Sequence, residues 1–213
     1  DLRDQRTLLV DKLSKIINIQ ANEVTVGKLP NGQDEKHFVI TIGGKALVNH
    51  FHTSELALEQ RDSSHQVNAE DVPNLYEVKW KDGNSLEITG GELKGYLDVR
   101  DGNEGEVGPN GIQSPQYKGI PYYIKKLNEF VRTFAKAFNE GIIGSTNGTG
   151  HADGYGLDPD KDGPADASTG IRFFTRLDSN GNPESSSTFI PTGSTDAEIE
   201  DIYKTLTAKN FTV

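Results

Sequence analysis

The chain has 213 residues, a length that allows one large domain or two small ones with a buried core. Only 33% of the residues are hydrophobic, 23 are glycine and the mean hydropathy is −0.59, which favours an elongated or loop-rich shape over a compact enzyme. The net charge of −10 argues against nucleic acid and anionic membranes as partners, and the lack of cysteine excludes disulfides and thiolate metal sites.

The amino terminus begins inside a regular pattern. Methionine is absent, even at position 1, and helical spacing already runs at Asp1, so we expect a fragment of a longer protein. No stretch reaches the roughly 18 apolar residues of a membrane span, and no cleavable signal peptide is visible. In a fragment, the missing signal peptide says nothing about targeting.

Residues 1–20 have the pattern of an amphipathic helix. Charged residues fill one face, and apolar residues fall near helical spacing on the other. These apolar residues are Leu2, Leu9, Leu13, Ile16 and Ile17.

The pattern changes to period two from Asn22 onwards. "HFVITIGG" places alternate apolar side chains on one face of a strand, and Asn31-Gly32 and Asp82-Gly83 are typical of hairpin turns. Residues 22–89 are therefore predicted to form a small antiparallel β domain, with a long exposed loop at 61–74.

Helical spacing returns in "GGELKGYLDVRDG" and is strongest in "IPYYIKKLNEFVRTFAKAFNE", residues 120–140. The apolar residues of the second segment are spaced 3, 4, 3 and 4, which is a heptad seam. The seam consists of Ile124, Leu127, Val131, Phe134 and Phe138, and Ile120, Tyr123 and Phe130 widen it. We expect this seam to pack against Leu9, Leu13 and Ile16 of the first helix.

After Gly141 the chain is glycine-rich and polar up to about Ala167, and shorter elements follow. "GIRFFTRL" and "NFTV" resemble strands, and "TDAEIEDIYKTL" predicts a helix capped by Thr195 with Glu198 three residues later.

These elements predict an elongated α+β fold in two domains. Long amphipathic helices in residues 1–21 and 90–213 form a rod-like domain with a loop-rich carboxyl-terminal part. The small β domain, residues 22–89, is inserted between them.

No catalytic motif is present: the sequence has no phosphate-binding loop, dinucleotide fingerprint, nucleophile elbow or zincin helix. His50 and His52 could share one side of a strand and begin a zinc or copper site. No third ligand is marked by spacing, so two exposed histidines are the preferred interpretation. His151 and Asp153 form a weaker pair of the same kind.

The stretch "GLDPDKDGPADAST" begins like the loop of an EF-hand. Asp158, Asp160 and Asp162 take positions 1, 3 and 5, and Asp166 takes position 9. Position 12 should be a bidentate Glu and is Thr169, and no helices flank the loop. A solvated turn is the preferred interpretation, with a structural calcium site as the alternative. No cofactor is expected otherwise.

Five of these segments, in order, resemble the FlgK family, the hook–filament junction proteins of bacterial flagella. "DLRDQRTLLVDKLSKIINI" is similar to the family's Asp-Leu-x-Asp-Gln-Arg-Asp-x-Leu helix, and "GGKALVNH" to its short Gly-x-x-Leu-Val strand. "ITGGELKGYLDVRDG" is similar to its Gly-Gly-x-Leu-x-Gly-Leu-Leu-x-x-Arg-Asp segment. "LNEFVRTFAKAFNE" resembles a long helix that ends in Ala-x-x-x-Asn and leads into a loop ending in Phe-Phe, here "GYGLDPDKDGPADASTGIRFFT".

Two departures from the family are visible. The stretch from residue 141 to 170 is longer than the family usually has, and the terminal coiled-coil regions are not in this chain. Family members often carry a short Asp- and Gly-containing turn before Phe-Phe, which favours the turn interpretation over calcium.

The resemblance implies a structural protein rather than an enzyme. Its copies would stack in a ring, with the hook protein and filament-side junction proteins as further partners. Export would run through the flagellar secretion channel without a cleaved signal peptide, to an extracellular position in the flagellum. The exposed helix faces and "GGELKGYLDVRD" would contact neighbouring subunits, and the chain by itself is expected to be monomeric.

Two other function classes stay open at this point. One is a secreted calcium- or glycan-binding β module that uses the loop from Asp158 to Asp166. The other is a hydrolase with scattered Asp and His residues, which no spacing supports. A β module would contain little helix, whereas a junction protein would contain substantial helix beside strand.

Overall fold

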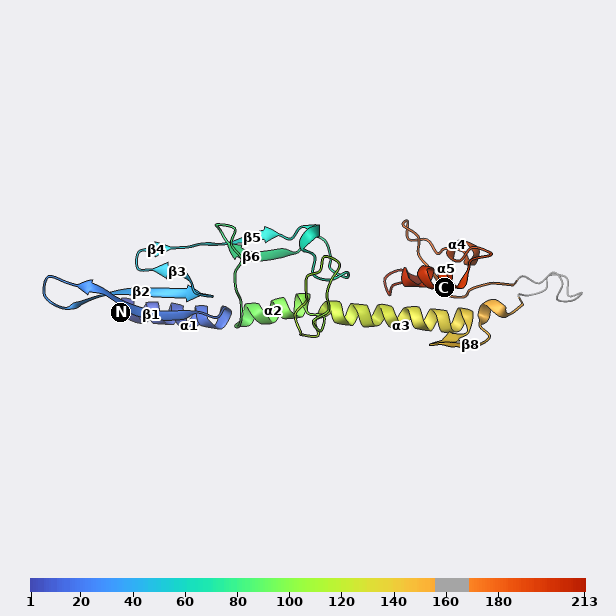
Figure 1. The fold of residues 1–213 in the computed structure, drawn as a ribbon, viewed down its shortest axis with the longest axis horizontal. Helices are drawn as coiled ribbons and strands as arrows, with labels where there is room; N and C mark the ends of the chain where they lie inside the picture. The colour runs from blue at the N-terminus through green and yellow to red at the C-terminus, as the bar shows by residue number, and fades with distance from the viewer. Residues whose placement is uncertain (156–168) are drawn as a thin grey trace, which may run out of the picture. The chain divides into compact units, whose positions relative to one another are not determined.

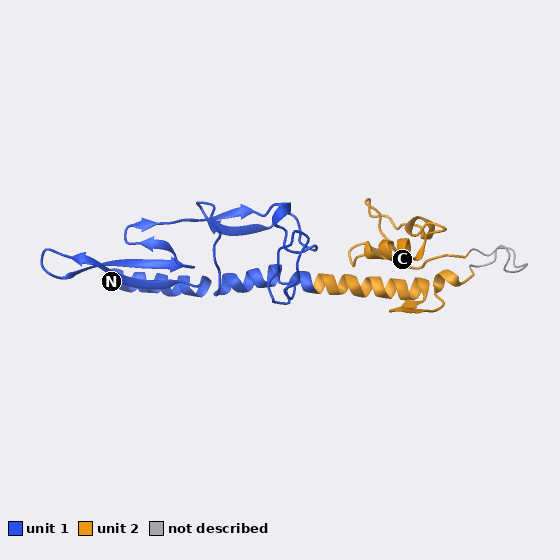
Figure 2. Cartoon of the chain, in the orientation of Figure 1, with its two compact units in different colours: residues 1–122 blue, residues 123–213 orange. Residues whose placement is uncertain are grey.

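The structure, a computed structural model, describes residues 1–155 and 169–213. The chain divides into two units, residues 1–122 and residues 123–213 (Figure 2). Five α-helices and several small antiparallel sheets are present in the described residues, which confirms the predicted α+β class. The helix α3 alone has 21 residues, so the chain does not have the low helix content that a β module would show. The rod-like form and the division at residues 22–89 stay predictions.

Unit 1 begins with helix α1, Leu2–Ile16, because Asp1 caps it: the Asp1 carboxylate accepts a hydrogen bond of 2.8 Å from the Arg3 amide. A four-stranded antiparallel sheet follows in the order β1-β2-β3-β4 (Figure 1). Gly32, at φ +82°, supplies the left-handed residue of the β1–β2 turn, as the Asn-Gly pair predicted. The strands are β1 Gln20–Lys28, β2 Asp34–Ile42, β3 Lys45–Asn49 and β4 His52–Thr53.

The rest of unit 1 is a second strand pair and a short helix. The pair is β5, Leu56–Gln60, with β6, Tyr76–Trp80, and the helix is α2, Glu92–Asp101. A 3₁₀ turn, η1, covers Ser63–His65. A buried cluster ties α1 to both strand groups; it consists of Ile17, Ile42 and Trp80, with Leu13, Ile19, Leu47, Leu86, Ile88 and Leu93 packed around it.

Unit 2 holds nearly all of α3, Ile120–Glu140, and the carboxyl-terminal elements. Helix α5, Asp196–Lys204, has the predicted capping box, in which Thr195 and Glu198 bond reciprocally. The shorter elements are β7 Ile142–Ile143, β8 Thr146–Asn147, the 3₁₀ turn η2 His151–Asp153, β9 Thr175–Arg176, α4 Ser186–Phe189 and β10 Phe211–Thr212. The buried cluster of unit 2 consists of Val131, Ala135, Phe189, Ile190, Tyr203 and Leu206.

The α3 seam has a partner within unit 2 that the sequence did not predict. Val131 is the one seam residue that is buried, and it packs on α4 and α5. The packing of the seam on α1 stays a prediction. Leu13 of α1 packs in the cluster of unit 1, while Leu9 and Ile16 are 65% and 49% exposed. Each helix therefore packs one side against the cluster of its own unit, through Leu13 in α1 and through Val131 in α3, and exposes several other apolar residues.

Candidate functional site

His50 and His52 lie at the β3–β4 turn of unit 1. His50 lies in the turn between β3 and β4 at φ +54°, and its ring stacks on His37 with centroids 4.0 Å apart. His52 lies exposed at the start of β4. Across residues 1–155 and 169–213, no group of three His, Asp or Glu side chains could hold a metal ion.

The other candidate ligands serve local structure or lie outside the described residues. His151 Nδ1 is 2.8 Å from the Ile171 carbonyl oxygen, and the Asp153 carboxylate accepts the Gly150 amide at 2.8 Å. The calcium candidates lie outside the described residues; they are Asp158, Asp160, Asp162 and Asp166. Within the described part of the chain, no helix is long and apolar enough to cross a membrane.

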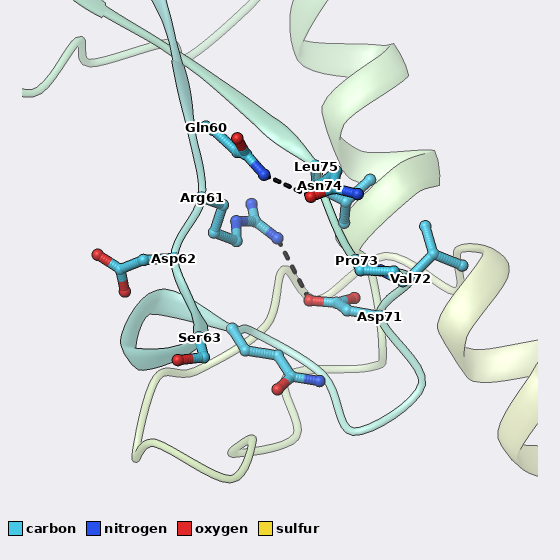
Figure 3. A pocket seen from close by; sticks show the side chains of 10 residues that line it. Gln60, Arg61, Asp62, Ser63, Asp71, Val72, Pro73, Asn74 and Leu75 are labelled. Atoms are coloured by element: carbon cyan, nitrogen blue, oxygen red, sulfur yellow. Dashed lines mark hydrogen bonds and ion pairs between the residues drawn. The ribbon is translucent and has the colours of Figure 1, made fainter.

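A buried ion cluster centred on Arg61 is the most concentrated group of charges in unit 1. Arg61 bonds three carboxylates: Asp101 at 2.9 Å, Glu77 at 3.0 Å and Asp71 at 3.3 Å. The side chains of Arg61 and Asp71 are 6% and 4% exposed. Figure 3 shows Arg61 directed at Asp71. Both residues line a pocket of about 390 Å³. A buried arginine needs such partners, because an unpaired charge in the interior costs several kcal/mol.

This cluster holds the segment between β5 and β6 in place. The Asp71 carboxylate accepts the backbone amides of Val67 and Asn68, each at 3.1 Å, and the Asn68 side chain donates to the Asp101 carbonyl at 2.9 Å. Val67 and Asn68 are buried, so the predicted exposed loop at 61–74 was wrong in its centre. A lone arginine in a polar stretch gave no sequence signal for this arrangement.

The electrostatics of Asp101 follow from its two arginine neighbours. Burial by itself raises the pKa of this carboxyl, but the hydrogen bonds and charges of Arg100 and Arg61 outweigh burial and lower the pKa below its ordinary value. Arg100 binds the same carboxylate at 2.6 Å and also donates to the Tyr76 carbonyl. The charged groups are thus committed to holding β5, β6 and α2 together, which indicates a structural role.

In unit 2, the side chain of Asn139 clamps the backbone of the Phe173-Phe174 pair. Its amide oxygen accepts from the backbone N–H of Phe173 and of Phe174, both at 3.0 Å. Its amide nitrogen donates to the Phe174 carbonyl at 2.7 Å and to the Tyr203 hydroxyl at 2.9 Å. Asn139 and Ala135 are each 0% exposed. This geometry gives the Ala-x-x-x-Asn and Phe-Phe patterns a physical reason, since a small residue and an amide are both required there.

An ion pair completes the clamp. Arg172 Nε lies 2.7 Å from Glu140 Oε1, and the Tyr203 hydroxyl donates to the same carboxylate at 2.8 Å. Burial and the neighbouring Glu140 charge raise the pKa of Tyr203, so its hydroxyl stays protonated and remains a donor. The contact joins the end of α3 to segments more than 30 residues away in the sequence.

Most of the heptad seam of α3 lies on the surface. Val131 and Ala135 face the buried cluster, whereas seven apolar side chains on the adjoining face are between 38% and 64% exposed. We call this face the α3 stripe; it consists of Ile120, Tyr123, Ile124, Leu127, Phe130, Phe134 and Phe138. A fully buried aromatic side chain covers about 150–250 Å², and the seven side chains of the stripe are each about half exposed. The exposed area of the stripe is therefore on the order of 600 Å². That is the upper end of the largest apolar patch on a typical monomer, about 300–600 Å², and such patches mark interaction sites.

A second, smaller apolar face lies on α1. Leu2, Leu9 and Ile16 are 81%, 65% and 49% exposed and are spaced seven residues apart. We call these three residues the α1 stripe. Because a heptad interval returns to nearly the same side of a helix, the three side chains form one line along it.

Comparison with known proteins gives one family match. A family model described as the helical domain of the flagellar hook-associated protein FlgK matches residues 1–161. No curated protein and no solved structure gives a significant match.

Proposed function

Since this chain belongs to the FlgK family of flagellar hook-associated proteins, we propose that it is a subunit of the hook–filament junction that acts by packing against neighbouring subunits. Members of this family have a structural role in the flagellum and are not enzymes. In this proposal, copies of the chain form a ring, with the hook protein and filament-side junction proteins as further partners. The protein reaches an extracellular position by the flagellar secretion channel.

One observation carries the proposed mechanism: the α3 stripe is a heptad-spaced apolar face that is exposed on a well-anchored helix. On the adjoining side, α3 is held by the buried cluster of unit 2 and by the Asn139 clamp. A rigid helix whose second apolar face is about half exposed suits docking, because little conformational entropy is lost when a partner covers it.

Two further features support a role in assembly rather than in catalysis. The charged groups around Arg61 and Glu140 hold distant segments of one unit together. The formal charge of −10 and the polar β strands suit a solvent-exposed projection, which we assign to residues 22–89. The helical parts, residues 1–21 and 90–213, would supply the subunit contacts.

The proposal is tested by placing a charge in the α3 stripe in a strain that needs this protein for motility. Leu127→Glu introduces a carboxylate at a side chain that is 53% exposed, so the chain is expected to fold and to be secreted normally. We expect loss of attached filaments and of swimming, because a charge in an apolar contact must be desolvated. Thr133→Glu, exposed on another face of the same helix, is the matched control.

The two variants separate the outcomes. Wild-type filament attachment with Leu127→Glu would contradict packing through the α3 stripe. Equal loss with Thr133→Glu would show a general effect of added charge on this helix. Normal filaments in cells that lack the whole protein would contradict the junction role itself.

A further inference from the structure

We propose that the α1 stripe of one copy packs against the α3 stripe of a second copy, as a two-helix contact of the coiled-coil type. This inference rests on the proposed function and names the occupant of the α3 stripe. The sequence predicts that α1 and α3 pack together within one chain. We place this contact between two copies of the chain instead. Within the described residues of a single chain, Phe134 and Phe138 contact Phe174 on one side, with ring centroids 5.1 Å apart in each case. Both stripes nevertheless keep exposed apolar surface, and one contact between two copies would cover it.

The spacing of the two stripes matches. Leu2, Leu9 and Ile16 recur every seven residues, and the α3 stripe recurs at 3 and 4 residues. Both intervals correspond to the 3.5-residue repeat that lets side chains of one helix enter the gaps of another along a whole contact. Helix α1, with 15 residues, is about 22 Å long, and α3, with 21 residues, is about 31 Å long, so α3 can hold the full length of α1.

The side chains of the two stripes also complement one another in size. The α1 stripe is wholly aliphatic, whereas the carboxyl-terminal half of the α3 stripe carries Phe130, Phe134 and Phe138. Facing positions in a packed core alternate large and small side chains. A parallel pair of α3 stripes would instead set phenylalanine against phenylalanine along that half.

The symmetry of the contact favours α1 over a second α3 as the occupant. Two α3 stripes would pair about a two-fold axis, and such a pair closes on itself and leaves both α1 stripes exposed. A contact between two different faces is heterologous, so each copy can bind one neighbour through α1 and another through α3. Only a heterologous contact can continue around a ring.

The small area of the α1 stripe makes each single contact weak. Three aliphatic side chains contribute less than the roughly 800 Å² that each partner brings to a standard interface. The free chain is therefore monomeric when dilute, as the sequence predicts. In an assembly, several contacts per subunit hold the partners together and raise the effective concentration of each one.

The absence of cysteine allows a direct test by cross-linking. Leu9→Cys copies and Leu127→Cys copies are mixed at high concentration with a short bismaleimide reagent, and each is also treated alone. Both positions are exposed, so neither change removes a buried side chain. The matched control is a mixture of Leu8→Cys and Thr133→Cys copies, whose exposed positions lie on the same helices but outside the stripes.

We expect the stripe mixture to give several-fold more covalent dimer than the control mixture or either variant alone. The dimer runs at twice the 23.3 kDa monomer mass, and peptide mass spectrometry should join residue 9 of one copy to residue 127 of the other. Dimer from Leu127→Cys alone at the same yield would overturn the inference in favour of self-pairing of α3. A cross-link within one chain of the dilute double variant, or no dimer above the control, would also overturn it. In each of these cases the Leu127→Glu motility test still decides the proposed function separately.

Discussion

Replacing Asn139 with alanine tests whether the amide clamp stabilises unit 2 as its geometry implies. The change removes two hydrogen bonds to the amides of Phe173 and Phe174, one from the side chain to the Phe174 carbonyl and one to the Tyr203 hydroxyl. Tyr203 keeps its bond to Glu140, so three backbone groups lose their partner. Each such loss in a buried or half-buried place costs about 1–3 kcal/mol. Because Phe173 is 42% exposed and water can reach its amide, we expect a total near the low end, about 3–5 kcal/mol.

Urea unfolding followed by circular dichroism measures this loss as a shift of the midpoint at constant slope. Asn128→Ala is the graded control: Asn128 is also buried, but its side-chain oxygen accepts one backbone amide, that of Ala208, at 2.9 Å. We expect it to cost about 1 kcal/mol. Asn139→Asp keeps the acceptor, loses both donors and adds a charge beside Glu140, so it should destabilise at least as much as the alanine change. If Asn139→Ala cost no more than Asn128→Ala, the clamp would not be the main polar contact at the end of α3.

Three further predictions concern the ion cluster and the acidic loop. Arg61→Met removes the arginine partner of buried Asp71 and one of the two arginine partners of Asp101, and it should destabilise unit 1 by about 3–5 kcal/mol in urea unfolding. A loss under about 1 kcal/mol would contradict the cluster's role. The pKa of Asp101 is lower in the folded protein than the ordinary value of 3.8. The ionised Asp101 carboxylate therefore stabilises the fold fully above pH 3.8, and this stabilisation is lost as the pH falls through the lower folded pKa. Urea midpoints measured from about pH 5 to about pH 2 should fall more steeply for the wild type than for Asp101→Asn. Calorimetric titration with Ca²⁺ should show no saturable heat and no difference between the wild type and Asp160→Ala, and saturable binding that Asp160→Ala abolishes would make the loop an ion site.

The local elements could be predicted well, because their signals are short in sequence. Heptad spacing marked α3, Asn31-Gly32 marked the β1–β2 turn, and the Thr195–Glu198 pair marked the cap of α5. Helix α1 ends at Ile16, four residues before the predicted end, since strand β1 already starts at Gln20. Periodicity shows which side chains share a face of a helix or strand, and it therefore locates these elements along the chain.

The polar contacts could not be predicted, because their partners are far apart in the chain. Arg61 and Asp101 are 40 residues apart, and Asn139 lies 34 residues before the Phe173 amide that it binds. Neither contact leaves a repeat or a fixed spacing. The Ala-x-x-x-Asn and Phe-Phe patterns were visible in the sequence. The sequence did not show that the Asn139 side chain binds the backbone of Phe173 and Phe174.

The sequence by itself determined that α3 is a helix with a continuous apolar seam, because the 3.6-residue period is a local property of the chain. Only the tertiary structure decided which side of that helix is buried. Residues 171–211 fold back onto Val131, Ala135 and Asn139, whereas the bulkier stripe beside them stays 38% to 64% exposed. An apolar pattern predicts that one face of a helix will be buried. Which segment packs on that face depends on distant parts of the chain or on another chain.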